Sequence, residues 1–172
     1  YIDNKFKERQ NREEVNILFT NSWSDLPNNF ILRGGCDLVK AFLLIASDCP
    51  HLYLNIRSSI PADVMSTDLT SILVSHPRIK LISDKISDQE IIRLFADADI
   101  FPLDAASLHS VSVLRAMACG CTCIVSDVPG YNEYVKDQST GFILSGKSKM
   151  INKIDDTSGW IMDDYSNAMI TT

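Results

Sequence analysis

Short apolar runs alternate along the chain with stretches in which apolar residues recur every three or four positions. The runs are bounded by turn residues and are short enough to be strands, and they cover 15–20, 52–56, 79–83, 99–102, 121–126 and 141–144. The helical spacing predicts helices around 38–45, more weakly at 61–74, after the capping-box sequence 87–90, and at 110–119. Residues 21–34, between the first strand and the first helix, are predicted to form a loop.

This order of elements predicts an α/β fold. The strands are continuous apolar runs, which is typical of a parallel sheet with helices on both faces, as in a Rossmann-like domain. We expect residues 15–145 to form this domain, residues 1–14 to be a linker or tail, and the segment 146–172 to be unclear. Ligands of such sheets bind beyond the carboxyl ends of the strands, so the loops after those ends are the candidate site.

The composition of the chain excludes several classes of protein. The 172 residues are 45% hydrophobic and 22% charged with a net charge of −6, which indicates a folded core and no basic footprint for nucleic acid. No apolar run is as long as a membrane span. The polar start carries no pattern of a secretory signal, so we expect a cytoplasmic protein. Because the sequence begins with Tyr1, we expect it to be a fragment of a longer chain.

Three of the five cysteines form the sequence Cys119-Gly-Cys-Thr-Cys123. A metal site is one interpretation, but zinc sites favour two to four residues between paired cysteines and need four ligands. Small buried thiols at a helix end and in a core strand are the favoured interpretation. We therefore predict no metal, and reduced thiols.

The loop before the helix at 110–119 is the best candidate for chemistry. Ser110 or a neighbour could cap that helix, and the remaining backbone N–H groups could hold a phosphate. A plain capped helix is the alternative. His109 is either an acid–base group or a loop residue without a role. Glu133 either caps the helix that follows Pro129-Gly130 or reaches the ligand crevice.

Arg33 stands beside Gly34 and Gly35, where the backbone is permissive and a ligand could approach closely. Arginine pairs well with phosphate oxygens, although an exposed arginine without a role is the favoured interpretation from residue type alone. The dinucleotide fingerprint Gly-x-Gly-x-x-Gly and the P-loop motif are both missing from the sequence.

From Pro102 onward, the motifs Ala116-Met-Ala-Cys-Gly120, Gly130-Tyr-Asn-Glu133 and Gly141-Phe142 occur in order. This series resembles the C-terminal, donor-binding domain of GT-B glycosyltransferases of family 4, also called group 1. A weaker likeness covers 19–42. The resemblance implies one half of a GT-B fold, which binds a nucleoside-diphosphate sugar as donor substrate without a further cofactor.

The resemblance also implies roles for individual residues. Arg33 matches the second residue of a basic pair that grips the donor diphosphate, while the first falls at Asn21–Ser22 and is not basic. The diphosphate-holding amides map to His109, Ser110 and Val111. The two glutamates of the family's Glu-x7-Glu motif are replaced by Ser107 and Arg115. In the family, the second glutamate contacts the ribose of the donor. Arg115 stands at its position, and a guanidinium can only donate hydrogen bonds to ribose hydroxyls, so weaker binding of the nucleotide sugar is expected.

The resemblance implies the donor half of a retaining hexosyltransferase that passes sugar to a glycan, lipid or small acceptor, as in polysaccharide biosynthesis. We expect this fragment to be inactive alone, because the acceptor-binding N-terminal domain is not in it. Peripheral membrane association of the full protein stays open. The alternative is a degenerate donor domain that acts as a scaffold or partner-binding module, and a GT-B-like epimerase rests on fold analogy only.

Overall fold

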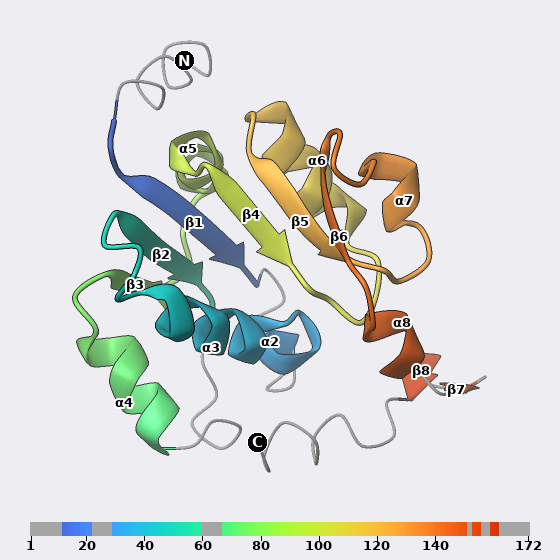
Figure 1. Ribbon diagram of the computed structural model, residues 1–172, viewed down its shortest axis with the longest axis horizontal. Helices are drawn as coiled ribbons and strands as arrows, with labels where there is room; N and C mark the ends of the chain where they lie inside the picture. The colour runs from blue at the N-terminus through green and yellow to red at the C-terminus, as the bar shows by residue number, and fades with distance from the viewer. Residues whose placement is uncertain (1–11, 22–28, 60–66, 151–152, 156–158, 162–172) are drawn as a thin grey trace.

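A six-stranded parallel sheet forms the centre of the protein, in the order β3-β2-β1-β4-β5-β6 (Figure 1). The computed structural model describes residues 12–21, 29–59, 67–150, 153–155 and 159–161. The strands are β1 Val15–Thr20, β2 Leu52–Arg57, β3 Ile79–Ile82, β4 Ile100–Leu103, β5 Thr122–Ser126 and β6 Gly141–Leu144. The predicted Rossmann-like fold is confirmed.

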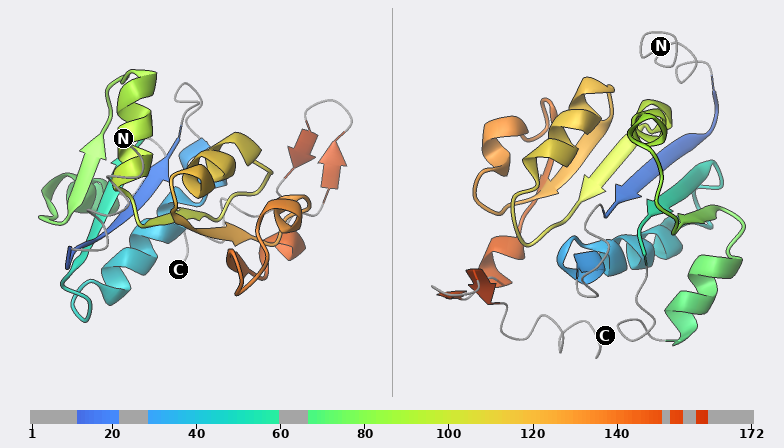
Figure 2. Two further views of the ribbon diagram at one scale, coloured as in Figure 1. Left: turned by 90° about the horizontal axis from the view of Figure 1, so that it is seen from above. Right: turned by 180° about the vertical axis from the view of Figure 1, so that it is seen from behind.

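Helices cover both faces of the sheet, with α3 on one side and α5 and α6 on the other (Figure 2). Their bounds are α2 Asn29–Leu32, α3 Gly35–Ile45, α4 Thr67–Ser75, α5 Asp88–Asp97, α6 Ser110–Ala118 and α7 Tyr131–Tyr134. In β1 the side chains alternate between two cores. Ile17 and Phe19 pack with α2, α3 and α4, whereas Leu18 packs with α5, α6 and α7.

The chain reverses direction across the sheet between β1 and β4. From β1 it moves to β2 and β3, and then returns to the other side of β1 to form β4. The strand order therefore reverses between β1 and β4, and the carboxyl ends of the strands at such a point are the usual ligand position in doubly wound sheets. Thr20 lies opposite Arg57 in the register, so the end of β2 reaches the same edge.

The predicted elements agree with the structure to within one or two residues at most ends. Both hydrogen bonds of the predicted capping box are present: the Ser87 side chain accepts from the Glu90 N–H, and the Glu90 side chain accepts from the Ser87 N–H. The predicted loop 21–34 is partly wrong, because Asn29–Leu32 form the short helix α2. Phe30 anchors it by packing edge-on against Phe19, with ring centroids 5.4 Å apart. The first part of the helix predicted at 61–74 lies outside the described residues.

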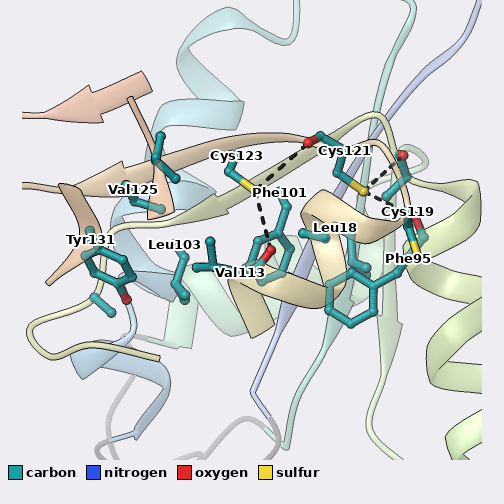
Figure 3. Packing of buried hydrophobic residues seen from close by; sticks show 14 of the residues in the cluster. Leu18, Phe95, Phe101, Leu103, Val113, Cys119, Cys121, Cys123, Val125 and Tyr131 are labelled. Carbon is teal, nitrogen blue, oxygen red and sulfur yellow. Dashed lines mark hydrogen bonds between the residues drawn. The ribbon is translucent and has the colours of Figure 1, made fainter. Parts of the chain in front are cut away.

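Three cysteines lie in the core of α5, α6 and β5, as the favoured interpretation predicts (Figure 3). Cys119 and Cys121 are 6% exposed and Cys123 is fully buried. The Cys121 thiol points to the carbonyl oxygens of Phe95 and Ala98, at 3.2 and 3.4 Å. Burial raises the pKa of Cys123 to about 11. These thiols act as small core residues.

The segment after β6 carries structure that the sequence pattern did not reveal. Lys147–Met150 form the short helix α8, and β7 Lys153–Asp155 pairs antiparallel with β8 Gly159–Ile161. The Asp127 carboxylate accepts hydrogen bonds from the backbone N–H groups of Gly146 and Ser148, at 2.8 and 2.7 Å, which fixes the start of α8. Within the described part of the chain, every helix is too short or too polar to cross a bilayer.

Candidate functional site

The first turn of α6 lies at the carboxyl edge of the sheet and has no side-chain cap. His109 occupies the N-cap position, and neither it nor Ser110 caps the helix, so the predicted serine cap is wrong. The first intrahelical bond runs from Val113 N to His109 O, at 3.4 Å. The N–H groups of Ser110, Val111 and Ser112 precede it and carry the positive end of the helix dipole.

Arg33 reaches this helix start from the turn between α2 and α3. Only 2% of the residue is exposed. Its Nη1 donates to His109 Nδ1 at 3.0 Å, and its Nη2 donates to Ser112 Oγ at 3.2 Å. Its Nε is buried and has no hydrogen-bond partner. Desolvation lowers the pKa of Arg33 to about 10, so the guanidinium stays charged at neutral pH.

His109 is neutral in this arrangement. Burial, and then the nearby Arg33 charge, lower its pKa to about 4. Because Arg33 donates to Nδ1, the ring proton lies on Nε2, which faces Ser107 Oγ at 3.3 Å. The imidazole therefore links Arg33 to Ser107. A neutral ring whose Nδ1 is occupied by a guanidinium orients Arg33, which favours a positioning role over the acid–base role considered from the sequence.

The Tyr131 hydroxyl fixes the loop in front of α6. It accepts a hydrogen bond from the backbone N–H of His109 at 3.2 Å and donates to the Ser107 carbonyl oxygen at 3.0 Å. Tyr131 is fully buried, and desolvation raises its pKa to about 12. The N–H groups left free at the helix start are therefore those of the first turn, beyond His109.

A close backbone contact brings the Arg33 turn against the loop after β4. Gly34 has φ +80, and a Cβ there would lie 2.6 Å from the Asp104 carbonyl oxygen. Lys147, which is 6% exposed, reinforces the contact through its Nζ, 2.8 Å from Asp104 Oδ2 and 3.3 Å from Asp37 Oδ2. Glycine is required here both by φ and by space.

A second polar cluster lies at the ends of β1 and β2. Arg57 Nη1 donates to the Asn21 carbonyl oxygen at 2.8 Å, and Asn21 Nδ2 donates to Ser58 Oγ at 3.2 Å. Asn21 Oδ1 and Arg57 Nε are buried without hydrogen-bond partners. Together with Arg33 Nε, these are the unsatisfied buried side-chain atoms among the described residues.

The structure gathers part of the predicted site. Arg33, Ser107 and His109 form one hydrogen-bonded group at the start of α6. Val111 is 61% exposed in the first turn, and Arg115 lies one turn further along the helix and is exposed. Asn21 belongs to the second cluster, and Ser22 lies outside the described residues.

Three residues escaped the sequence analysis: Ser112, Tyr131 and Arg57. Nothing in the local sequence marks Ser112. Tyr131 stands in the motif Gly130-Tyr-Asn-Glu133, but the motif does not indicate its contacts, because the hydrogen-bond partners of both residues are far away in the chain. Arg57 could have been found from the sequence, because it is a charged residue directly after the apolar run 52–56, at the end of a strand where ligands bind. Glu133 is exposed in the first turn of α7, where the N-cap has no side-chain hydrogen bond, so it does not cap that helix.

The family model for the group 1 glycosyltransferases matches residues 33–157. This range is well over half of the chain, which therefore belongs to this family. It contains Arg33, Ser107 and His109 and the whole of α6, whereas Asn21 of the second polar cluster precedes it. No curated protein has a significantly similar sequence.

Solved structures share the fold at low sequence identity. The C-terminal domain of a group 1 glycosyltransferase family protein, LpcC from Francisella tularensis, aligns at 15% identity and a TM-score of 0.65, covering 86% of this chain and 76% of that domain. HepE from Anabaena, in complex with UDP and glucose, aligns at 15% identity and a TM-score of 0.56, covering 86% of this chain and 39% of its own.

The catalytic domain of starch synthase IV from Arabidopsis thaliana, bound to ADP and acarbose, aligns at 15% identity and a TM-score of 0.59. The alignment covers 98% of this chain and 34% of the synthase chain. The chain thus spans three quarters of the isolated Francisella domain but little more than a third of the longer Anabaena and Arabidopsis chains. At these identities the likeness shows the fold.

Proposed function

We propose that this chain is the donor-binding domain of a glycosyltransferase, and that it holds a nucleoside-diphosphate sugar by its diphosphate at the start of α6. The observation that carries this proposal is Arg33, a buried cation whose described partners are a neutral imidazole and a hydroxyl. Burying an uncompensated charge costs several kcal/mol, about what an anionic ligand would offset. The first-turn N–H groups of α6 precede the first intrahelical bond, and they belong to the same helix start that Arg33 contacts.

Family membership supports this choice of ligand. The crystal structure of HepE is in complex with UDP and glucose, and the catalytic domain of starch synthase IV is bound to ADP and acarbose. We infer a retaining sugar transfer to a glycan, lipid or small acceptor, with the acceptor held by a further domain, since longer relatives extend well beyond the matched part. Arg33 and the helix dipole would offset the diphosphate charge without a metal.

Calorimetric titration of the chain with UDP, GDP and ADP tests the proposal. We expect at least one to bind with a dissociation constant in the micromolar to millimolar range, and Arg33→Met to weaken it at least about 30-fold, since charge-assisted hydrogen bonds are lost. Arg93→Met, on the exposed face of α5, is the matched control. If none of the three nucleotides binds at millimolar concentration, the proposal fails.

A degenerate donor domain that serves as a scaffold is the second candidate. Ser107 and Arg115 stand at the positions that the resemblance assigns to two glutamates, and Arg115 is exposed on α6. Restoring both, as Ser107→Glu with Arg115→Glu, in a protein that includes the acceptor domain separates the two candidates. Degeneracy predicts no transfer by the wild type and a gain on restoration. Transfer by the wild type without such a gain would exclude it.

A further inference from the structure

Lys147, at the start of α8, is a buried cation whose ion pairs the proposed function does not use. The helix follows β6 at the carboxyl edge of the sheet (Figure 1). Lysine ammonium groups normally reach water, but only 4% of this side chain is exposed. Its Nζ lies 2.8 Å from Asp104 Oδ2 and 3.3 Å from Asp37 Oδ2. The lysine thus crosses from α8 to the loop after β4 and to the first turn of α3.

The backbone around Lys147 is held in place without the help of its side chain. The Asp127 carboxylate accepts hydrogen bonds from the N–H groups of Gly146 and Ser148, which precede and follow the lysine. The hydroxyl of Ser148 also donates to Asp127, at 2.8 Å. The start of α8 therefore has its own anchor, and the ion pairs of Lys147 act mainly on the acidic residues that it reaches.

Asp104, the nearer of these acids, lies in a segment that is fixed against the Arg33 turn. The Ala106 N–H donates to the Leu32 carbonyl oxygen at 2.8 Å. A Cβ at Gly34 would lie 2.9 Å from the Asp104 Cβ. Because the two backbones are in contact at both points, only side-chain rotation decides where the Asp104 carboxylate points, and the pair with Lys147 sets that direction.

The pKa of Tyr131 indicates that the Asp104 charge reaches the candidate site. Desolvation raises this pKa to about 12, and the Asp104 carboxylate contributes to the rise, whereas the His109 N–H and the Arg33 guanidinium oppose it. The Tyr131 hydroxyl accepts from the His109 N–H, directly before the first turn of α6. Asp104 would therefore repel an anion bound at this helix start, and the ammonium group of Lys147 compensates for that repulsion.

Asp104 is also an alternative anion for Arg33. Among the described residues, the side-chain partners of Arg33 are His109 and Ser112, both neutral. A carboxylate that turned toward the guanidinium would form a charge-assisted pair and compete with a diphosphate. We propose that Lys147 is a positioning residue that holds the Asp104 carboxylate away from Arg33 and so keeps the guanidinium available for a diphosphate. This inference rests on the proposed function.

Titrations of the intact chain with inorganic pyrophosphate and with UDP, GDP and ADP test this role. Lys147→Met removes the ammonium group that pairs with Asp104. It should weaken pyrophosphate and the best-bound nucleotide about fivefold or more, because the carboxylate then repels or replaces the phosphates. Lys149→Met removes the same charge from an exposed position of α8 and is the matched control, with an expected change of less than about twofold.

Asp104→Asn distinguishes this electrostatic role from a structural one. Added to Lys147→Met, it should restore affinity to within about twofold of the wild type, because the repelling charge is gone. Alone, it should raise affinity about twofold or more, since Lys147 then adds positive charge near the site. The ratio of wild-type to Lys147→Met affinity should also shrink between about 0.05 M and about 0.5 M sodium chloride, because salt screens the repulsion.

The opposite results overturn the proposal. An unchanged affinity in Lys147→Met would leave the lysine no role in binding, and a loss that Asp104→Asn does not restore would make it a structural residue or a phosphate ligand. An equal loss in Lys149→Met would reduce the effect to net charge. If Lys147→Met melts far below the wild type, Asp104→Asn alone decides, and an unchanged or weaker affinity refutes the role. A wild type that binds neither pyrophosphate nor nucleotides would refute the proposed function itself, whereas failures confined to the variants refute only this inference.

Discussion

Helices α5 and α6 both begin at the carboxyl edge of the sheet, but their first turns are built in opposite ways. In α5, Ser87 Oγ accepts from Glu90 N at 3.3 Å, and Glu90 Oε2 accepts from Ser87 N at 2.8 Å. In α6 no side chain caps the helix, and its first turn has no acidic residue. A closed helix start satisfies its own donors, whereas an open one leaves them for a ligand.

The same contrast separates two arginines, of which Arg33 is buried and Arg78 is half-buried. Arg78 donates to the carbonyl oxygens of Ala46, Cys49 and Leu52 at the amino edge of the sheet. Arg33 instead has two neutral side-chain partners and an unsatisfied Nε at the carboxyl edge. An arginine that donates hydrogen bonds to several carbonyl oxygens stabilises the fold. A buried cation without an anion lowers the stability of the fold as long as no anionic ligand is bound.

The largest expected effect comes from replacing each arginine with methionine. Arg33→Met should leave the melting temperature unchanged or raise it, while nucleotide affinity falls at least about 30-fold. Arg78→Met should lower stability by about 2–3 kcal/mol, because three carbonyls lose a charged donor, with affinity unchanged. Thermal denaturation and calorimetry measure both. A strong loss of stability in Arg33→Met would show that Arg33 serves the fold.

Gly34→Ala is expected to have the next largest effect. The added Cβ would lie 2.6 Å from the Asp104 carbonyl oxygen, at a residue with φ +80. We expect a loss of about 2–3 kcal/mol from backbone strain and the clash, and weaker nucleotide binding because the Arg33 turn moves away from α6.

Gly146→Ala provides the control for this substitution. Gly146 also has a positive φ, +120, but a Cβ there meets nothing within 4 Å. Its loss of stability should be about 1 kcal/mol, from the backbone conformation alone. Equal melting temperatures for the two variants would contradict the close contact between Gly34 and the loop after β4.

His109 should make the stability depend on pH. Its pKa falls from 6.5 to about 4 on folding, so the unfolded chain binds more protons between these values. Its contribution is then complete above pH 6.5 and is lost as the pH falls toward 4, amounting to about 2 kcal/mol after allowance for solvent screening.

His109→Gln should remove this part of the pH dependence. The difference between wild-type and variant unfolding free energies, from urea titrations at pH 4, 5, 6 and 7, isolates it from the carboxyl groups. His51→Gln, at an exposed residue of the amino edge, is the matched control substitution. A His109→Gln profile parallel to the wild type would mean that burial and the Arg33 charge do not hold His109 neutral.

The sequence predicted the sheet well because each strand is a local apolar run. It missed α2, which depends on the distant packing of Phe30 on Phe19. It also missed the hairpin of β7 and β8, where no hydrophobic pattern marks the strands. Local periodicity identifies elements that bury a continuous face, and it is silent where tertiary contacts decide.

The candidate site was harder to predict than the fold. Arg33 and His109 are 76 residues apart in the chain, and only the sheet topology brings them together. Residue type alone favoured an exposed Arg33, whereas the structure buries it. The sequence could not indicate that His109 is neutral either, because this depends on burial and on the guanidinium beside it.

The smallest expected effect tests the two helix starts directly. Ser87→Ala removes the cap of α5 and should cost about 1 kcal/mol of stability. Ser110→Ala, in the uncapped first turn of α6, should change stability by less than about 0.5 kcal/mol. Neither should alter nucleotide affinity much, since the α6 donors are backbone groups. If Ser110→Ala destabilised the protein as much as Ser87→Ala, Ser110 would be a cap after all, and the α6 donors would not be free for a ligand.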